Sequence, residues 1–276
     1  MNQNWIIDNI NNAFGTWNAK LAELWTLVSM SPQAFKGGAI WAIMQSIHSA
    51  MMAIGYGLLI LFFAIGLFKN TANFHDLKRP EAAIGYFIRF VAAKALVGYS
   101  MTIMLKVFEV CNGIVSQAAG SLGGINQAMV TLPAQIATAI NSVGFLASIP
   151  LWLVTILGSL FITVLSFVMI LTVYGRFFRL YMYTALAPIP LSTFAGDSTQ
   201  SVGISFIKTY IGVCLEGAVI VLAFIIYSGF VSTPSVSTGT ATNIVWSYLA
   251  ETIFNMLVLV GLIKGSDRVI HEMMGL

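Results

Sequence analysis

Residues 151–190 read LWLVTILGSLFITVLSFVMILTVYGRFFRLYMYTALAPIP, an uncharged apolar run that leads into two arginines and two prolines. The uncharged part, 151–175, is longer than the roughly 20 residues that cross about 30 Å of hydrocarbon as a helix. Arg176 and Arg179 mark its end, and Pro188 and Pro190 interrupt the following apolar segment before it reaches that length. The stretch therefore predicts a transmembrane helix followed by a broken segment.

Composition extends this prediction to the whole chain of 276 residues. Charged residues make up 8% of it and hydrophobic residues 58%, and the mean hydropathy is +0.88. Soluble domains carry about 25% charged residues, and their surface has to meet water. The predicted fold class is an all-α, polytopic helical membrane protein.

Five transmembrane helices are expected, with a broken segment, 176–208, between the third and the fourth. The spans are about 40–68, 82–110, 145–175, 209–230 and 244–263. Lys and Arg are retained on the cytoplasmic side of membranes. They occur in the turn 69–81, at 176–208 and in the C-terminal tail, whereas 112–144 and 231–243 contain none. This alternation predicts an outside N-terminus and a cytoplasmic C-terminus, and a sixth span at 180–196 would violate it.

The N-terminal segment, 1–38, is predicted to be a separate amphipathic helix, followed by a transmembrane domain, 39–276. Its apolar residues recur every three or four positions, as on one face of a helix. They are Ile6, Ile10, Phe14, Trp17, Leu21, Leu24 and Val28. The stripe suits a helix lying in the membrane interface, and it equally suits packing on the protein's own spans. A short amphipathic helix is also expected within 125–143.

The broken segment is interpreted as a re-entrant or interfacial elbow on the cytoplasmic side. Arg176 and Arg179 would extend their charged ends to lipid phosphates. Pro188 and Pro190 lack backbone donors and disfavour helical geometry in the residues before them. At membrane depth, protein or a watery cavity would have to satisfy the carbonyls that they release. A simple kinked helix end is the alternative.

The same residues resemble a known family. The pattern R-x-x-R-L-x-x-x-x-A-x-A-P-I-P-L, followed by F-I-K-x-Y-x-G, is similar to the core signature of TrbL-type proteins, the polytopic inner-membrane channel subunits of type IV secretion and conjugation. The matching positions are Arg176, Arg179, Leu180, Ala185, Ala187, Pro188, Ile189, Pro190, Phe206, Lys208 and Tyr210. Many relatives carry a large extracytoplasmic domain, so this chain resembles the compact forms on conjugative elements of Gram-positive bacteria.

The resemblance implies a non-enzymatic channel or assembly subunit in the bacterial cytoplasmic (inner) membrane. It implies self-association, contact with cytoplasmic ATPases and other secretion components, and transient contact with transferred single-stranded DNA or a relaxase. We expect no cofactor and leave open a bound phospholipid. Two other functions remain open: a small-solute transporter with its site at the broken segment, and a membrane scaffold without a translocation path.

Candidate catalytic or metal-binding groups are sparse. His48, His75 and His271 lie far from one another and from Cys111 and Cys214 in the sequence, and no metal-ligand or phosphate-binding motif is present. The predicted layout puts the two cysteines on opposite sides of the bilayer, so no disulfide is expected. His48 is interpreted as a helix-packing group, with a proton relay as the alternative. These observations argue against an enzyme.

Four charges fall inside predicted spans: Arg89, Lys94, Glu216 and Glu251. A charge near the bilayer centre costs about 2.5–3.5 kcal/mol on insertion scales, so such groups face partners or water. Their depths predict two pairs, Arg89 with Glu216 and Lys94 with Glu251. Either the pairs specify helix packing, or the charges line a polar path through an oligomer. Small residues such as Gly113 would let helices approach closely.

Overall fold

The structure is a computed structural model that describes residues 4–71, 80–120, 128–231 and 239–275. Within these ranges every regular element is an α-helix or a 3₁₀-helix, which confirms the predicted all-α class. The elements are α1 (Asn4–Val28), η1 (Phe35–Gly38), α2 (Ala39–Thr71), α3 (Pro80–Gly98), α4 (Ser100–Gly120), α5 (Ala134–Ser142), α6 (Phe145–Leu186), α7 (Pro188–Ser192), η3 (Thr193–Ala195), α8 (Gln200–Val231) and α9 (Ala241–Met274).

Among the described residues, four helical segments are long and apolar enough to cross a membrane: Phe35–Lys69, Ser148–Leu186, Gln200–Val231 and Ala241–Met274. The bent pair α3 and α4 would be a fifth, so the expected number of about five spans is confirmed. Short helix α5 falls within the predicted 125–143, of which residues 125–127 lie outside the described ranges. The orientation of the spans stays a prediction.

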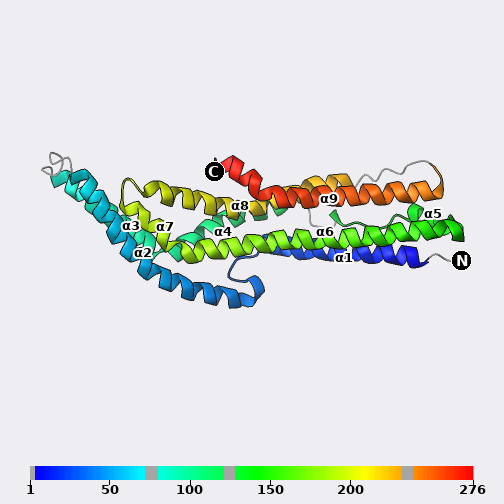
Figure 1. The fold of residues 1–276 in the computed structure, drawn as a ribbon, viewed down its shortest axis with the longest axis horizontal. Helices are drawn as coiled ribbons and strands as arrows, with labels where there is room; N and C mark the ends of the chain where they lie inside the picture. The colour runs from blue at the N-terminus through cyan, green and yellow to red at the C-terminus, as the bar shows by residue number, and fades with distance from the viewer. Residues whose placement is uncertain (1–3, 72–79, 121–127, 232–238, 276) are drawn as a thin grey trace. The chain divides into compact units, whose positions relative to one another are not determined.

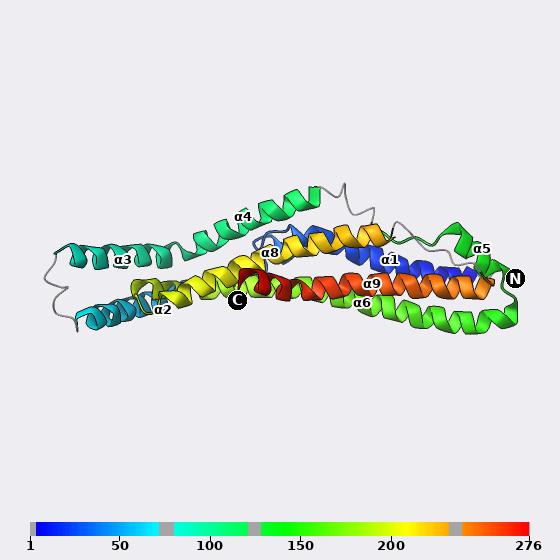
Figure 2. The same cartoon turned by 90° about the horizontal axis from the view of Figure 1, so that it is seen from above.

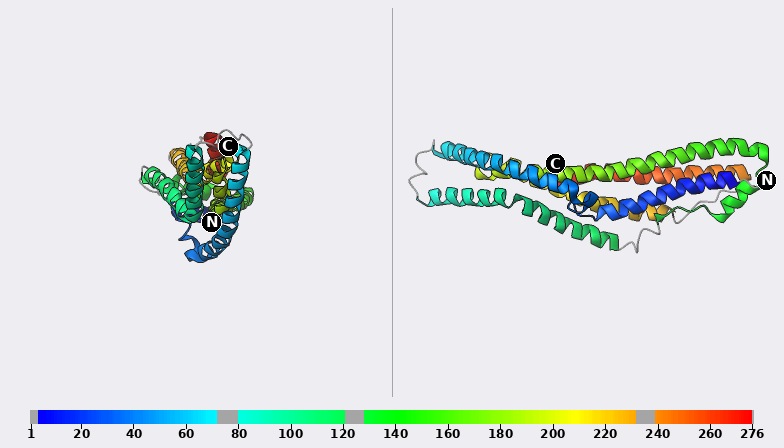
Figure 3. Two further views of the ribbon diagram at one scale, coloured as in Figure 1. Left: turned by 90° about the vertical axis from the view of Figure 1, so that its left-hand side faces the viewer. Right: turned by 90° about the horizontal axis from the view of Figure 1, so that it is seen from below.

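The second span differs from the straight helix predicted over 82–110. Its two parts, α3 and α4, meet at an angle of 72° (Figure 3). Gly98 and Ser100 flank the joint, and the Ser100 hydroxyl donates to the carbonyl of Val97 at 2.7 Å. Glycine and serine pairs and such back-bonding hydroxyls are recognised causes of helix kinks. The span was predicted from the positions of apolar and charged residues, which do not reveal that a serine hydroxyl competes for a backbone carbonyl and bends the helix.

The chain forms two compact units. Unit 1 comprises Met1–Ser29, Val115–Gly175 and Gly217–Ser266, and unit 2 comprises Met30–Ile114, Arg176–Glu216 and Asp267–Leu276. The boundary predicted at residue 38 stays a prediction.

In unit 1 helix α1 runs beside other long helices of that unit (Figure 2), and its apolar stripe is buried. The seven stripe residues are at most 2% exposed. Two stripe residues have ring contacts: Phe14 meets Tyr248 of α9 at a centroid distance of 6.5 Å, and Trp17 meets Tyr227 of α8 at 6.3 Å. Of the two interpretations of this stripe, the structure therefore supports packing on the protein's own helices, among them α8 and α9.

In unit 2 the hairpin of α2 and α3 packs against α7 and η3 (Figure 1). Two glycines of α2 allow the close approach. A Cβ atom on Gly55 would lie 2.9 Å from the Cβ and carbonyl oxygen of Pro188, and one on Gly66 would lie 3.4 Å from the Cα of Gly196. Eleven residues make about three helical turns, so both glycines share one face of α2.

The broken segment is shorter than predicted. Helix α6 does not end at residue 175 but continues to Leu186, and the segment between it and α8, 187–199, contains the short helices α7 and η3 and a turn. Ala187 keeps helical angles (φ −50°, ψ −38°), and Ile189 lies inside α7, so the expected loss of helical geometry before the prolines is wrong. The reason is that Pro188 and Pro190 occupy the first turn of α7, where a missing N–H breaks no hydrogen bond within α7.

Candidate functional site

Pro188 releases one carbonyl in α6. Because proline has no N–H, the carbonyl of Thr184, four residues earlier, lacks its helical donor. His48 Nδ1 of α2 lies 2.9 Å from that carbonyl oxygen, and a carbonyl can only accept, so Nδ1 carries the proton. His48 Nε2 lies 3.1 Å from the Ser100 hydroxyl. Protein rather than a watery cavity thus satisfies the carbonyl at the break, in keeping with a packing role for His48.

A second feature, which we call the arginine cluster, consists of Arg176, Arg179, Glu216 and Asp267. Arg179 of α6 donates through Nη2 to Glu216 Oε1 of α8 at 2.6 Å and through Nη1 to Asp267 Oδ1 of α9 at 2.5 Å. The Glu216 side chain is 2% exposed, whereas that of Asp267 is 45% exposed. One guanidinium therefore links three helices of unit 2.

Arg176 makes a different set of bonds. It is 1% exposed and donates from Nε to the carbonyl of Val213 at 3.2 Å and from Nη2 to the carbonyl of Cys214 at 3.1 Å. The prediction that its charge extends to lipid phosphates is wrong, because α6 continues past this position and α8 covers the side chain. A carbonyl oxygen within a helix keeps a second lone pair, which makes it a suitable acceptor for this guanidinium.

The arginine cluster contains two cations and two carboxylates. The second carboxylate oxygen of Glu216, Oε2, is buried without a hydrogen-bond partner among the residues that the structure describes. In those ranges, no three His, Cys, Asp or Glu side chains gather as metal ligands would. The arrangement can hold helices together and neutralise charge at membrane depth.

The predicted pair of Arg89 and Glu216 is wrong. Arg89 of α3 forms its ion pair with Asp197, in the turn after η3, and Glu216 is bonded to Arg179. The pair was predicted from the depths of the residues in the membrane, with the third span ending at residue 175. Arg179 then lay outside the span and was not considered as a partner of Glu216. Lys94 is exposed on α3 in unit 2, and Glu251 belongs to unit 1, so their pairing stays a prediction.

The remaining motif residues include buried, half-buried and exposed positions, and Ile189, Pro190 and Phe206 are half-buried. Leu180, Ala187 and Pro188 are buried against their own unit, whereas Lys208 is exposed on α8. Tyr210 is 1% exposed and donates its hydroxyl proton to the carbonyl of Met104 at 2.9 Å.

Aromatic rings of α6 and α8 meet close to the prolines. The Tyr183 ring lies against those of Phe206 and Tyr210 at centroid distances of 5.7 and 6.3 Å. The motif therefore forms interior contacts between α6 and α8, and these contacts were not expected from the sequence.

The two cysteines also differ from expectation. Cys111 of α4 and Cys214 of α8 are buried free thiols within hydrogen-bonding reach of each other. The prediction that they lie on opposite sides of the bilayer is wrong. The predicted span 82–110 is bent at Tyr99, and α4 continues past residue 110 to Gly120, so Cys111 lies within α4 and beside α8.

Comparison with known proteins bears on these positions. The family model described as TrbL/VirB6 plasmid conjugal transfer like protein matches residues 17–188, more than half of the chain. The match includes Arg176 and Arg179 and ends at Pro188, so the motif positions from Ile189 onward rest on the sequence resemblance alone. A search of curated proteins and a search of solved structures each gave no match.

Proposed function

The chain belongs to the TrbL/VirB6 plasmid conjugal transfer-like family, and from this premise we propose that it is a non-enzymatic subunit of the translocation channel, working as a homo-oligomer in the inner membrane. Membership makes it a membrane component of conjugal transfer, which acts with other components of that machinery. The channel role, the self-association and the membrane are our proposal.

The observation that carries the proposal is how the break in α6 is filled. A transporter site built on a broken helix uses the released carbonyls to bind solute. In this chain His48 donates a hydrogen bond to the carbonyl of Thr184, and Pro188 lies against Gly55. These contacts support a structural role for the break rather than a solute-binding site. The arginine cluster, whose charges neutralise one another, supports the same role.

A groove beside the break suits the phospholipid that the sequence left open. Its volume is about 560 Å³, and it is lined by apolar side chains of α6, α7 and α8, with Arg179 at its edge. Met182, Leu186, Ile189, Pro190 and Phe206 contribute to the lining. An acyl chain matches such a wall, whereas the charge of Arg179 is already taken up by Glu216 and Asp267.

Helix α4 carries a surface suited to self-association. A Cβ atom on Gly113 would have no atom within 4 Å. Its neighbours Val110 and Ile114 are 70% and 51% exposed. A glycine between exposed apolar side chains lets a second helix approach closely in lipid. We therefore assign contact between copies of the chain to this surface.

The partners follow from the proposed orientation. Lys208 is exposed on α8 and, with the turn 69–81, would face cytoplasmic ATPases. The turn lies largely outside the described residues. Transferred single-stranded DNA or a relaxase would be bound only transiently, since the net charge is +3 and a dense basic strip is absent from the sequence.

The test combines a transfer assay with a measurement of subunit number. A donor strain lacking the gene is complemented with the wild-type chain, with Gly113→Leu or with Gly57→Leu, a control at another glycine with open space around it. We expect Gly113→Leu alone to lower conjugation frequency and the oligomeric mass in native mass spectrometry. Full transfer by a chain that remains monomeric would refute the proposal, and solute uptake by the purified protein would favour a transporter.

A further inference from the structure

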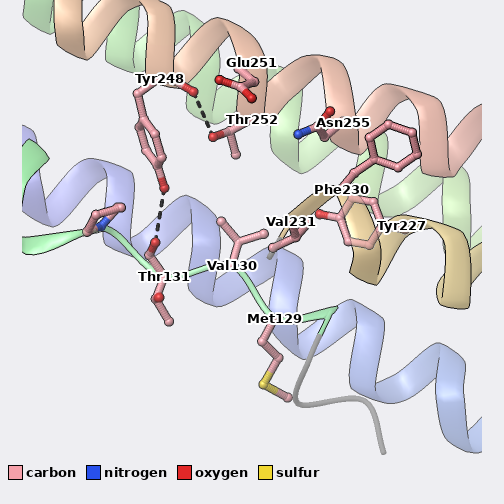
Figure 4. A pocket seen from close by; sticks show the side chains of 11 residues that line it. Met129, Val130, Thr131, Tyr227, Phe230, Val231, Tyr248, Glu251, Thr252 and Asn255 are labelled. Carbon is pink, nitrogen blue, oxygen red and sulfur yellow. Dashed lines mark hydrogen bonds between the residues drawn. The ribbon is translucent and has the colours of Figure 1, made fainter. Parts of the chain in front are cut away.

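Unit 1 contains a pocket between α9, the last turns of α8 and the segment 129–133, and its hydroxyl groups are already bonded within the protein (Figure 4). Thr252 donates to the carbonyl of Tyr248 at 2.8 Å, and the Tyr248 hydroxyl donates to the carbonyl of Thr131 at 3.1 Å. The Tyr227 hydroxyl has Trp17 as its side-chain partner. The reactive groups that the proposed function does not use lie instead in unit 2.

These groups are the two cysteines of the chain. Cys111 of α4 and Cys214 of α8 are buried free thiols within hydrogen-bonding reach of each other. The sequence contains no other cysteine. A disulfide requires two cysteines that face each other at short range, and this pair meets that requirement.

Two hydrogen bonds fix the position of α4 on α8 beside the thiols. The Tyr210 hydroxyl donates to the carbonyl of Met104 at 2.9 Å. These residues lie about one turn before the cysteine of α8 and about two turns before that of α4, respectively. Arg176 of α6 donates to the carbonyl of Cys214 itself at 3.1 Å. The two thiols are therefore held toward each other by contacts on both sides of the pair.

The two thiols differ in their access to a reagent. Cys111 is 5% exposed and lines a groove of about 550 Å³, whereas Cys214 is fully buried and is not among the described residues of the groove wall. Apolar side chains of α4 and α8 form most of that wall: Ile103, Val107, Val110, Ile114, Ile211 and Leu215. An apolar reagent dissolved in the bilayer would therefore reach Cys111 first.

We propose that Cys111 and Cys214 form a reversible disulfide that cross-links α4 to α8. The oxidant is an external disulfide, RSSR. The Cys111 sulfur, as thiolate, attacks one sulfur of RSSR and releases the first RSH, and the Cys214 sulfur then attacks the mixed disulfide and releases the second. The two cysteine sulfurs are oxidised, the two sulfurs of RSSR are reduced, and the two thiol protons leave on the two molecules of RSH.

The disulfide would lock the bend of the second span. Helices α3 and α4 meet at 72°, and Cys111 lies about three turns past the bend at Tyr99. In the reduced chain, hydrogen bonds and packing hold α4 on α8, and such contacts can open. A covalent bond would prevent α4 from moving away from α8, and it would also restrict the unfolded chain. The oxidised protein should therefore be the more stable form.

The experiment uses the full chain in nanodiscs and dithiodipyridine, an apolar disulfide whose reduced product, pyridine thione, is counted by its absorbance. The wild-type chain should release two thiones and keep no pyridyl group, and its intact mass should fall by two hydrogen atoms. Peptide mapping without reduction should find Cys111 joined to Cys214. Dithiothreitol should restore both thiols.

Single serine variants test the order of attack. Cys214→Ser keeps the thiol that lines the groove, so it should release one thione at about the wild-type initial rate and keep one pyridyl group. Cys111→Ser keeps only the buried thiol and should react more slowly, by about tenfold or more. Oxidation should raise the Tm of the wild-type chain, whereas the same treatment of Cys111→Ser should leave its Tm unchanged.

The wild-type chain decides the proposal even if a serine variant fails to fold, because its mass separates an internal disulfide from two pyridyl adducts. Two adducts on one chain, a disulfide between two chains, or no thione release from the native protein would overturn the inference. Equal rates for the two serine variants, or equal Tm values for the oxidised and reduced wild-type chains, would also contradict it.

Discussion

The arginine cluster predicts that Glu216 and Asp267 contribute very unequally to stability, although both accept a hydrogen bond from Arg179. We consider Glu216→Gln and Asp267→Asn, which each remove one negative charge and conserve shape. The Glu216 side chain is 2% exposed and interacts electrostatically with Arg176, whose guanidinium donates to two backbone carbonyls of α8. The Asp267 side chain is 45% exposed, so water screens its interaction.

These environments set the magnitudes. Removing one partner of a buried ion pair costs about 3–5 kcal/mol, and we take the lower value, about 3 kcal/mol, because glutamine keeps an acceptor and Arg179 keeps Asp267. A pair exposed to solvent contributes about 0.2–1 kcal/mol. At roughly 2–4 °C per kcal/mol for a chain of this size, Glu216→Gln should lower Tm by about 6–12 °C and Asp267→Asn by at most about 4 °C.

The assay is thermal unfolding of both variants in identical nanodiscs, followed by tryptophan fluorescence, with free energies from steric trapping as a second measurement. Arg268→Gln serves as the control, because the side chain of that arginine is 85% exposed and its Nε donates to Glu272, which is 66% exposed on the same helix. Equal losses from Glu216→Gln and Asp267→Asn would refute the reasoning, since burial would then not determine the value of the pair.

Three further predictions concern residues of α2 and α3 that contact the end of α6 and the segment 187–199. His48→Leu leaves the carbonyl of Thr184 unsatisfied and should cost about 1–3 kcal/mol, whereas His48→Gln, which can still donate, should restore part of that loss in the same unfolding assay. Gly55→Ala should lower the unfolding free energy by about 1–3 kcal/mol through its clash with α7, while Gly57→Ala, at an open position of the same helix, should leave it equal or raise it by up to about 1 kcal/mol; equal effects would contradict the packing described. Arg89→Gln should change stability by less than about 1 kcal/mol, because both members of its ion pair are more than one-third exposed, and a larger loss would assign that pair a structural role.

The sequence predicted the number of spans and the face of α1 that is buried, because both depend on simple periodicity and on length. The stripe from Ile6 to Val28 has the helical spacing that any apolar environment would bury. Periodicity does not say which surface covers the stripe, and the choice between lipid and the protein's own helices needed three-dimensional contacts.

The charge pairs could not be predicted from depth alone. The third span was predicted to end at Arg176 because arginines usually mark a membrane boundary. This rule fails where neighbouring helices supply hydrogen-bond acceptors for the arginines. The missing signal was Asp267, which lies far from Arg179 in the sequence and close to it in the fold. His48 is recognisable in the sequence as a polar residue within a span, but its acceptor is identifiable only once Pro188 is known to release the carbonyl of Thr184.

Cryo-electron microscopy of the full chain in nanodiscs tests the central claim, self-association into a channel subunit, most directly. We predict a ring of identical subunits in which α4 and its Gly113 surface form the contacts between neighbours. A monomer with an enclosed polar cavity at residues 187–199 would contradict the account and indicate a solute transporter.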